Sequence, residues 1–393
     1  MKEKRNDGNG GTGGEFQGSI MKGLLAAEPS KQYHRTKLIL SLLATGLEWA
    51  YLLLLVLTPL AVRLAELTRL SGNPYLHFLL FSLAAGLVAL VFSLPLSFAS
   101  GYVVEQRYNL SNQSPAAWAW ERLKGLLVGG ALGLPLALAF YACLRSFGAG
   151  WWLPVGVMVF LFTVVLGRLA PILIFPLFYR FEPLADDHPL KARIEHLCGS
   201  VGLNVAGVYR FNLSKTTKKA NAAFTGLGRA KRVLLADTLL DQFPEEEIEA
   251  VIAHELGHFR LRHIWKGMAL GMVLTFIGLF VVARIHFGLA GEDVAALATL
   301  PWLALLLSVY GFLTGPLSNT FSRRQEFAAD RYAVKLIDQG DSMATAPSAV
   351  LRASLERLAE LNLADRDPHP LVEFLFHGHP SIKRRLAALG ERE

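Results

Sequence analysis

The sequence is short of charged residues. Asp, Glu, Lys and Arg make up 18% of its 393 residues, whereas hydrophobic residues make up 52%. A soluble domain usually carries about 25% charged residues. The deficit argues against a soluble protein with an ordinary polar surface, and it indicates that much of the surface faces lipid.

Cysteine is also scarce, since only Cys143 and Cys198 occur. Two distant cysteines form neither a disulfide framework nor a Cys-x-x-Cys zinc site, and they fit a reducing compartment. The N-terminal residues do not fit a signal peptide, because no apolar core with a small-residue cleavage site follows closely enough. We expect residues 1–36 to be a polar, disordered leader, with Met21 as an alternative start.

The net charge of +7 does not point to nucleic acid. Lys and Arg lie mainly beside apolar stretches, as they do in membrane proteins that orient by charge. A nucleic-acid-binding surface would instead gather these residues into a basic patch. We therefore expect the lipid bilayer, and not nucleic acid, as a partner.

Six apolar stretches are long enough to cross a bilayer, which takes about 20 helical residues. Trp151 and Trp152 occupy the position of an interfacial aromatic anchor. The fold class is therefore predicted as mainly α, a multi-pass helical membrane protein. The stretches lie at residues 38–62, 77–100, 125–144, 151–175, 267–290 and 297–317.

Basic residues predict the orientation. They are frequent before the first stretch, between the second and third, and after the fourth and sixth, and they are sparse in the other connections. This pattern places both termini and residues 180–266 in the cytoplasm. Glu48 and Arg168 fall at membrane depth, where charges usually face a protein interior or a watery cavity. Arg168 is equally compatible with a side chain that reaches the interface.

A small α/β region lies between the fourth and fifth stretches. Residues 187–201 have the spacing of an amphipathic helix. Residues 205–211 and 232–235 are short and partly β-branched, as strands are. Residues 244–261 form a further helix that begins with Pro and three Glu, which suit a helix N-terminus.

This last helix contains His254-Glu255-Leu-Gly-His258. Histidines four residues apart lie on one helical face and can bind one zinc ion. Glu255 lies about 100° round the helix from His254, where it can contact a water on the metal without being a ligand. We predict Glu255 as the catalytic general base. The alternative is a surface helix that carries two histidines.

Glu326 and Asp330 follow the sixth stretch, on the same side of the membrane as this helix. Glu326 would complete a His2Glu ligand set with the fourth position open, as in catalytic zinc sites. Asp330, one turn later, would accept a hydrogen bond from a ligand histidine. By itself the pair also fits an ordinary acidic surface beside Arg324 and Arg331. We predict one zinc ion per chain.

At these residues the chain resembles the type I CAAX prenyl protease family, integral-membrane zinc endopeptidases of the gluzincin type. The resemblance runs from about the first apolar stretch to the C-terminus. The further matching segments are Phe175–Phe178, Phe181–Leu184, Lys215–Gly226, Lys231–Leu240 and His379-Pro380 with Arg385.

The resemblance implies substrate-binding and catalytic roles. Asn221 and Ala222 match a strand edge that pairs with the substrate backbone. His379 matches a histidine that stabilises the oxyanion, and Arg385 an arginine nearby, counted here among the substrate-binding residues. His377 stands two residues before His379, and only the proline that follows His379 distinguishes the two.

Two departures from the family pattern stand out. Ala223 follows Asn221-Ala222 where the family usually has tyrosine, which leaves the details of the substrate edge open. Eukaryotic members have seven spans and not six, which leaves the exact span count open.

The resemblance also implies a ring of membrane helices around a water-filled chamber, with the zinc site at its cytoplasmic rim. We divide the chain accordingly into a leader, a four-span membrane domain, a cytoplasmic catalytic region, two further spans, and a C-terminal cytoplasmic segment with the third ligand. These segments are 1–36, 37–180, 181–266, 267–320 and 321–393.

The sequence thus predicts a zinc-dependent membrane endopeptidase. The six-span form and the lack of an endoplasmic-reticulum retention signal favour a bacterial inner-membrane member. The substrate is then either a protein prenylated at a C-terminal CAAX motif or an unmodified peptide or protein.

Two alternatives remain. A non-catalytic scaffold or transporter with structural zinc has no use for Glu255. A heat-shock-type quality-control protease has fewer spans before the motif.

Overall fold

The computed structural model describes residues 28–225, 231–338 and 346–390, and within them it confirms a mainly helical membrane fold. Six of the described helices are long and apolar enough to cross a membrane, in agreement with the six predicted spans. With their π- and 3-10-helical turns included, they are Pro29–Leu57, Pro74–Arg107, Pro115–Gly150, Trp152–Phe178, His263–Ala290 and Leu297–Asp338.

The first helix differs from its prediction at both ends. Helix α2 (Pro29–Leu57) begins within the segment predicted as a disordered leader, and residues 1–27 of that leader lie outside the described residues. The polar composition of residues 29–36 predicted disorder. The segment is helical instead, and tertiary contacts leave its Tyr33 only 4% exposed. The helix ends before residue 62 because Pro59 disfavours helical geometry at Thr58 and supplies no N–H. The short helix α3 (Leu60–Leu67) follows.

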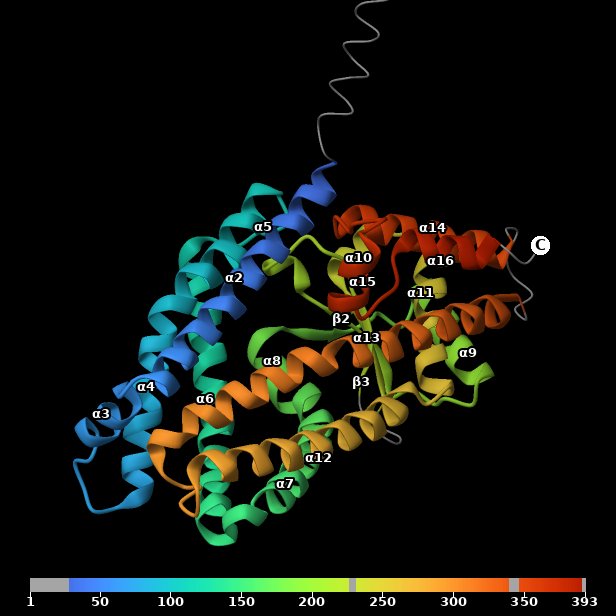
Figure 1. Ribbon diagram of the computed structural model, residues 1–393. Helices are drawn as coiled ribbons and strands as arrows, with labels where there is room; N and C mark the ends of the chain where they lie inside the picture. The colour runs from blue at the N-terminus through green and yellow to red at the C-terminus, as the bar shows by residue number, and fades with distance from the viewer. Residues whose placement is uncertain (1–27, 226–230, 339–345, 391–393) are drawn as a thin grey trace, which may run out of the picture.

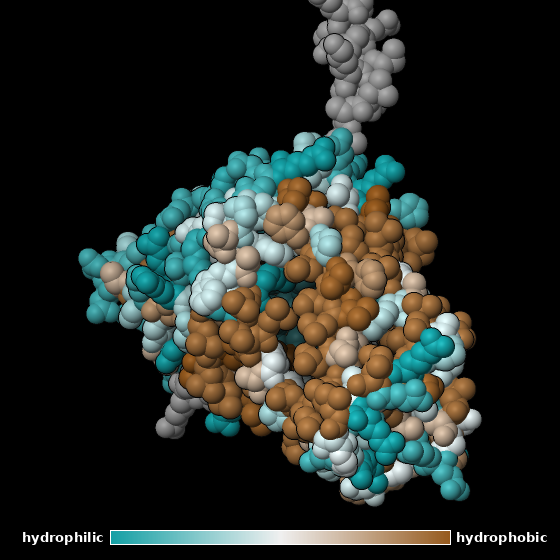
Figure 2. All heavy atoms as spheres, turned by 90° about the vertical axis from the view of Figure 1, so that its left-hand side faces the viewer, coloured by the Kyte–Doolittle hydropathy of each residue, from teal (hydrophilic) through white to brown (hydrophobic). Residues whose placement is uncertain are grey.

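The spanning helices close into a ring (Figure 1), as predicted. Each helix contacts the next in chain order, and the last, α13, returns to contact α2. Figure 2 shows broad apolar surfaces on the helices and a hollow between them with hydrophilic atoms at its depth. The other ring helices are α4 (Pro74–Phe98), α6 (Pro115–Phe147), α7 (Trp152–Leu169), α12 (His263–Ala290) and α13 (Leu300–Asp338).

Two ring helices extend through π-helical turns. Helix α4 continues through Ala99–Val103 into α5 (Val104–Arg107), and α7 continues through Ala170–Ile174 into α8 (Phe175–Phe178). Each extension passes the end of the predicted span. The helices therefore reach toward the sheet and its flanking loops.

The structure describes the surroundings of two membrane residues that the sequence singled out. Trp151 is not an interfacial anchor, because it is fully buried with its ring 5.6 Å from that of Phe140. The chain reverses at Gly148–Gly150 and folds this tryptophan inward. Glu48 accepts a hydrogen bond of 3.4 Å from Ser308, which joins α2 to α13.

The α/β region is built on a four-stranded sheet in the order β1-β2-β4-β3. β2 (Gly207–Phe211) and β4 (Arg232–Ala236) correspond to the two predicted strands and pair in parallel. β1 (Phe181–Pro183) and β3 (Ala222–Thr225) are antiparallel to their neighbours and too short for an alternating pattern to reveal. Because β3 pairs with β4 alone, its other edge is free of strands among the described residues.

Six further helices complete the α/β region in the described residues, and α9, α10 and α11 among them contact the sheet. Helix α11 lies between the sheet and α13 and contacts α9, α14 and β3 (Figure 1). Its Ile248, Ile252 and Leu256 are at most 1% exposed, which fixes the buried face of the helix. The six are α9 (Pro189–Ser200), α10 (Asp237–Gln242), α11 (Glu245–Arg260), α14 (Pro347–Leu361), α15 (Pro370–Phe376) and α16 (Ile382–Gly390).

Candidate metal centre

Helix α11 presents His254 and His258 on one face. Pro244 precedes the helix and three glutamates occupy its first turn, where they complement the helix dipole. The two imidazole rings meet edge to face, and their Nε2 atoms lie 3.1 Å apart. This arrangement is the one that the four-residue spacing predicts.

A glycine brings α11 against α13. A Cβ atom at Gly257 would lie 3.0 Å from both the Cα and the carbonyl oxygen of Ala329, closer than such contacts normally occur. The absence of a side chain therefore lets the two backbones approach. Glu326, one helical turn before Ala329, is thereby brought to the two histidines.

Three potential ligand atoms converge at this crossing. Oε2 of Glu326 lies 3.4 Å from His254 Nε2, and its Oε1 lies 3.4 Å from His258 Nε2. Ligands bound to zinc at roughly 2.0–2.1 Å in a tetrahedron lie about 3.3–3.4 Å apart. The two separations of 3.4 Å between histidine nitrogen and carboxylate oxygen match that spacing, and the 3.1 Å between the two Nε2 atoms is slightly shorter. Glu326 is only 4% exposed.

Asp330 backs the first histidine. Its Oδ1 lies 2.8 Å from His254 Nδ1. Nδ1 therefore carries the ring proton and donates a hydrogen bond to the carboxylate. Arg385 donates to the same carboxylate from Nε at 2.8 Å and from Nη2 at 2.5 Å. Arg385 is 8% exposed and lies 3.7 Å from Glu326 and 3.4 Å from His254 Nδ1, so its observed contacts are with residues of the candidate metal centre.

His263 backs the second histidine, and the sequence reasoning missed it. Its Nδ1 lies 3.0 Å from His258 Nδ1, and it is 5% exposed. The signal was present, since a further histidine stands five residues after the motif at the start of α12. With both Nδ1 atoms engaged, both Nε2 atoms are available to one metal ion, so the residues present fit zinc.

Glu255 lies beside this cluster in a half-buried position. Burial raises the pKa of its carboxyl group, and the adjacent His254 and His258 partly oppose that rise. A carboxylate with a raised pKa is a stronger base than an exposed one. The environment therefore suits the proton transfer predicted for Glu255.

The structure brings His379 to the cluster. Its Nδ1 lies 3.1 Å from Glu326 Oε1, and its side chain is 74% exposed. The Glu326 carboxylate raises the pKa of His379. Arg323 holds the preceding loop by donating to the carbonyl oxygens of Glu373 at 2.9 Å and His377 at 2.5 Å. His377 thus contributes its backbone to the loop.

Asn221 and Ala222 lie at the start of β3, the strand with a free edge. The carbonyl of Asn221 accepts a hydrogen bond of 3.0 Å from the amide of Ala236, which begins the pairing with β4. Helix α11, which carries the histidines, packs on β3. The structure therefore places strand β3 next to the helix that carries the two histidines.

Comparisons with known proteins agree with this arrangement. Residues 184–393 match the model of peptidase family M48, and residues 22–180 match a model described as CAAX prenyl protease N-terminal, five membrane helices. Within 28–180, the part of the second range that the structure describes, four helices are long enough to span a membrane.

Similar proteins occur in bacteria and eukaryotes. An uncharacterized metalloprotease, YhfN of Bacillus subtilis, is 28% identical over 91% of this chain and 84% of its own length. A CAAX prenyl protease 1 homolog of Arabidopsis thaliana is 31% identical over 83% and 77%. The crystal structure of S. mikatae Ste24p matches with a TM-score of 0.80 and 25% identity, over 92% of this chain and 88% of that one.

Proposed function

The chain belongs to peptidase family M48, and on that premise we propose that it is a zinc-dependent membrane endopeptidase with His254, His258 and Glu326 as ligands. The observation that carries the proposal is the close approach of the potential ligand atoms: the two Nε2 atoms lie 3.1 Å apart, and each lies 3.4 Å from one of the two oxygens of Glu326. One zinc ion per chain fits this set. The ion would supply a Lewis acid that polarises the substrate carbonyl and lowers the pKa of a water.

The chain's own residues would then move the protons. Glu255 accepts a proton from the attacking water, whose oxygen adds to the peptide carbonyl carbon. Glu255 passes that proton to the leaving nitrogen as the C–N bond breaks, which yields a carboxylic acid and an amine; at neutral pH the acid then gives its proton to the amine. His379, exposed beside Glu326, donates a hydrogen bond to the oxygen on which negative charge develops. Asp330 and Arg385 hold His254 in the tautomer that leaves Nε2 free.

We propose the free edge of β3, beginning at Asn221 and Ala222, as the binding site for the substrate backbone. An extended peptide can add to such an edge as one more strand. The contact between β3 and α11 would carry the bound segment past the metal centre. Relatives named CAAX prenyl proteases favour a prenylated C-terminal segment, whereas the name of the bacterial relative, an uncharacterized metalloprotease, specifies no substrate, so an unmodified peptide is the second candidate.

We further propose that the metal centre and both termini face the cytoplasm, in a bacterial inner membrane. Lysines gather at the end of the ring helices nearest the sheet, as the positive-inside rule requires of a cytoplasmic side. Lys37 and Lys124 lie on the ring helices, and Lys215 and Lys219 on the loop before β3. Green fluorescent protein fused after Glu393 would fluoresce in cells with this orientation, whereas a periplasmic C-terminus would leave it dark.

The decisive experiment compares wild type with Glu255→Gln, both purified in detergent with zinc content measured. We expect both proteins to bind one zinc ion per chain, and only wild type to cleave. A farnesylated CAAX peptide and its unmodified counterpart serve as substrates, so that the prenyl requirement is read from the same assay. Equal cleavage by both proteins would refute the mechanism.

A further inference from the structure

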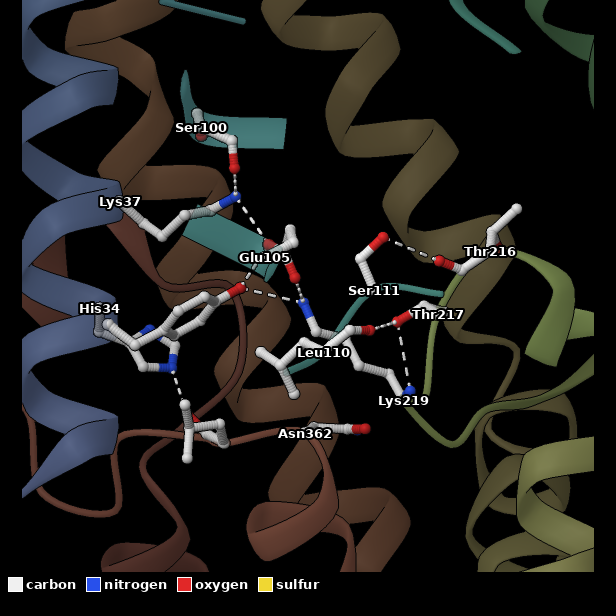
Figure 3. A network of polar contacts seen from close by, with 12 residues as sticks. His34, Lys37, Ser100, Glu105, Leu110, Ser111, Thr216, Thr217, Lys219 and Asn362 are labelled. Carbon is white, nitrogen blue, oxygen red and sulfur yellow. Dashed lines mark hydrogen bonds and ion pairs between the residues drawn. The ribbon is translucent and has the colours of Figure 1, made fainter. Parts of the chain in front are cut away.

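The segment that leads into β3 is held from the membrane side by charged residues (Figure 3). It runs from the 3-10 turn Leu213–Lys215 to Asn221. Lys219 Nζ lies 3.0 Å from Glu105 Oε2, and Lys215 Nζ lies 3.0 Å from Glu121 Oε1. Glu105 belongs to α5, the extension of α4, and Glu121 belongs to the ring helix α6, so two lysines of this segment are tethered to the membrane domain.

Glu105 is the centre of the larger cluster (Figure 3). Its side chain is 13% exposed, and besides Lys219 it accepts hydrogen bonds from Tyr33 at 2.7 Å and from Lys37 at 3.0 Å. Lys219 also donates to the Tyr33 hydroxyl at 3.0 Å. One carboxylate on α5 therefore joins α2 to the segment before β3. Partly buried charges that are paired in this way stabilise one arrangement, because losing one partner leaves another charge unpaired.

The backbone of the segment is held on the same side. The amide of Lys218 donates to the carbonyl of Leu110 at 2.9 Å, and the amide of Asn112 donates to the carbonyl of Thr216 at 3.1 Å. The Thr217 hydroxyl adds a bond of 2.8 Å to the Leu110 carbonyl. These contacts join the segment to the loop that follows α5.

An asparagine fixes the end of the segment. The side-chain oxygen of Asn362 accepts from the amide of Ala220 at 2.9 Å, and its amide nitrogen lies 3.3 Å from the Ala220 carbonyl. The next residue, Asn221, begins the pairing with β4. The tethered lysine, Lys219, thus stands three residues before Ala222.

We propose that Glu105 is a positioning residue which, through Lys219, sets the position of the free edge of β3 relative to the metal centre. The proposal rests on the proposed function, in which that edge binds the substrate backbone. Within the described residues, which stop at 225 and resume at 231, β3 spans Ala222–Thr225 and is paired with a strand on one side. So short an edge strand depends on its flanking contacts for a fixed position.

The test uses Glu105→Gln in the full-length, zinc-loaded protein. The amide keeps the shape of the side chain and still accepts from Tyr33, but it loses the charge that holds Lys219. The substrate is the unmodified peptide of the assay above. We expect KM to rise about tenfold and kcat to stay within about twofold, because a displaced strand edge misplaces the substrate. Zinc content should not change.

Two measurements separate this proposal from the proposed function. In a Glu255→Gln background, which cannot turn over, Glu105→Gln should weaken binding of the same labelled peptide about tenfold. Hydrogen exchange of the amides in 214–225 should become faster in Glu105→Gln without any substrate present. The exchange result therefore tests the positioning of β3 even if wild type cleaves neither peptide.

Arg193→Gln is the matched control. Arg193 forms a two-bond ion pair with Glu249, of 2.5 Å and 2.9 Å, which joins α9 to α11 away from the segment. We expect a lower Tm, with KM and the exchange of 214–225 unchanged. The double variant Glu105→Gln/Lys219→Met removes both charges of the ion pair. Because the tether is already lost in Glu105→Gln, the KM of the double variant should not exceed that of Glu105→Gln alone.

Unchanged KM, peptide affinity and exchange in Glu105→Gln would overturn the proposal. An equal rise of KM in Arg193→Gln would also overturn it, because a general loss of stability would then account for the effect.

Discussion

Oδ1 of Asp330 lies 2.8 Å from Nδ1 of His254, and the guanidinium of Arg385 donates hydrogen bonds to both oxygens of that carboxylate. The carboxylate is 2% exposed, so it would be costly to bury without these donors. It directs the proton of His254 to Nδ1 and leaves Nε2 bare. The availability of His254 Nε2 for a metal ion thus depends on Asp330, which is not itself a proposed ligand.

Asp330→Asn should lower zinc affinity by about 10–100-fold, the usual effect of losing such a partner. An amide is a weaker acceptor, and its NH2 group would oppose the Arg385 guanidinium. Chelator competition measures the affinity. Asp338→Asn, at the exposed end of the same helix, is the control and should bind zinc like wild type. Equal affinities for the two variants would contradict the role of Asp330.

Gly257→Ala should weaken the metal centre from a distance. The new methyl group would meet the Ala329 backbone at 3.0 Å, so α11 and α13 must separate and carry His258 away from Glu326. We expect a lower Tm and a loss of zinc at equilibrium. Gly199→Ala is the matched control, because nothing lies within 4 Å of its Cβ position on α9. Alanine there should raise stability by up to about 1 kcal/mol through helix propensity.

His263→Phe should lower zinc affinity, because the ring loses the nitrogen that accepts from His258 Nδ1 at 3.0 Å. His263→Asn restores an acceptor and should recover most of the affinity. His286→Phe changes a fully buried histidine of the same helix that contacts Thr299 instead. It should lower Tm without changing zinc affinity. If His263→Phe bound zinc as tightly as wild type, His263 would have no role in zinc binding and would serve only in packing.

Cys198 should resist alkylation in the folded protein. Burial raises the pKa of its thiol to about 12, and the residue is 0% exposed. Iodoacetamide reacts with the thiolate, so the native protein should remain unlabelled at Cys198 from pH 8 to pH 10. Denatured protein should label quickly over the same range. Mass spectrometry of the peptide that carries Cys198 gives the extent. Rapid native labelling at pH 8 would show that α9 opens readily.

Periodicity predicted those parts of the molecule in which local pattern and tertiary environment agree. The long apolar runs predicted six spans, and the four-residue histidine spacing predicted the pair on α11. Glu326 could be chosen because it follows a span at a helical position suited to a ligand.

The remaining features depend on contacts that no local pattern contains. His263 lies beyond the end of α11, and its ring meets His258 only because the chain turns through a left-handed residue at Arg262. Trp151 stands where an anchor would stand, but the turn before it directs its ring into the protein interior, against Phe140. Residues 29–36 are polar by composition and become helical because Tyr33 packs against the membrane domain.

Helix α13 runs from Leu300 to Asp338, with Pro316 inside it, so one continuous helix begins in the apolar ring and carries the proposed ligand Glu326 and its neighbour Asp330 in its second half. The ring contacts of its first half orient its second half. A water-soluble fragment made by deleting the apolar segments would therefore lose the scaffold that aims Glu326 at the histidines. The hydrolytic centre of this protein cannot be detached from the bilayer and keep its shape.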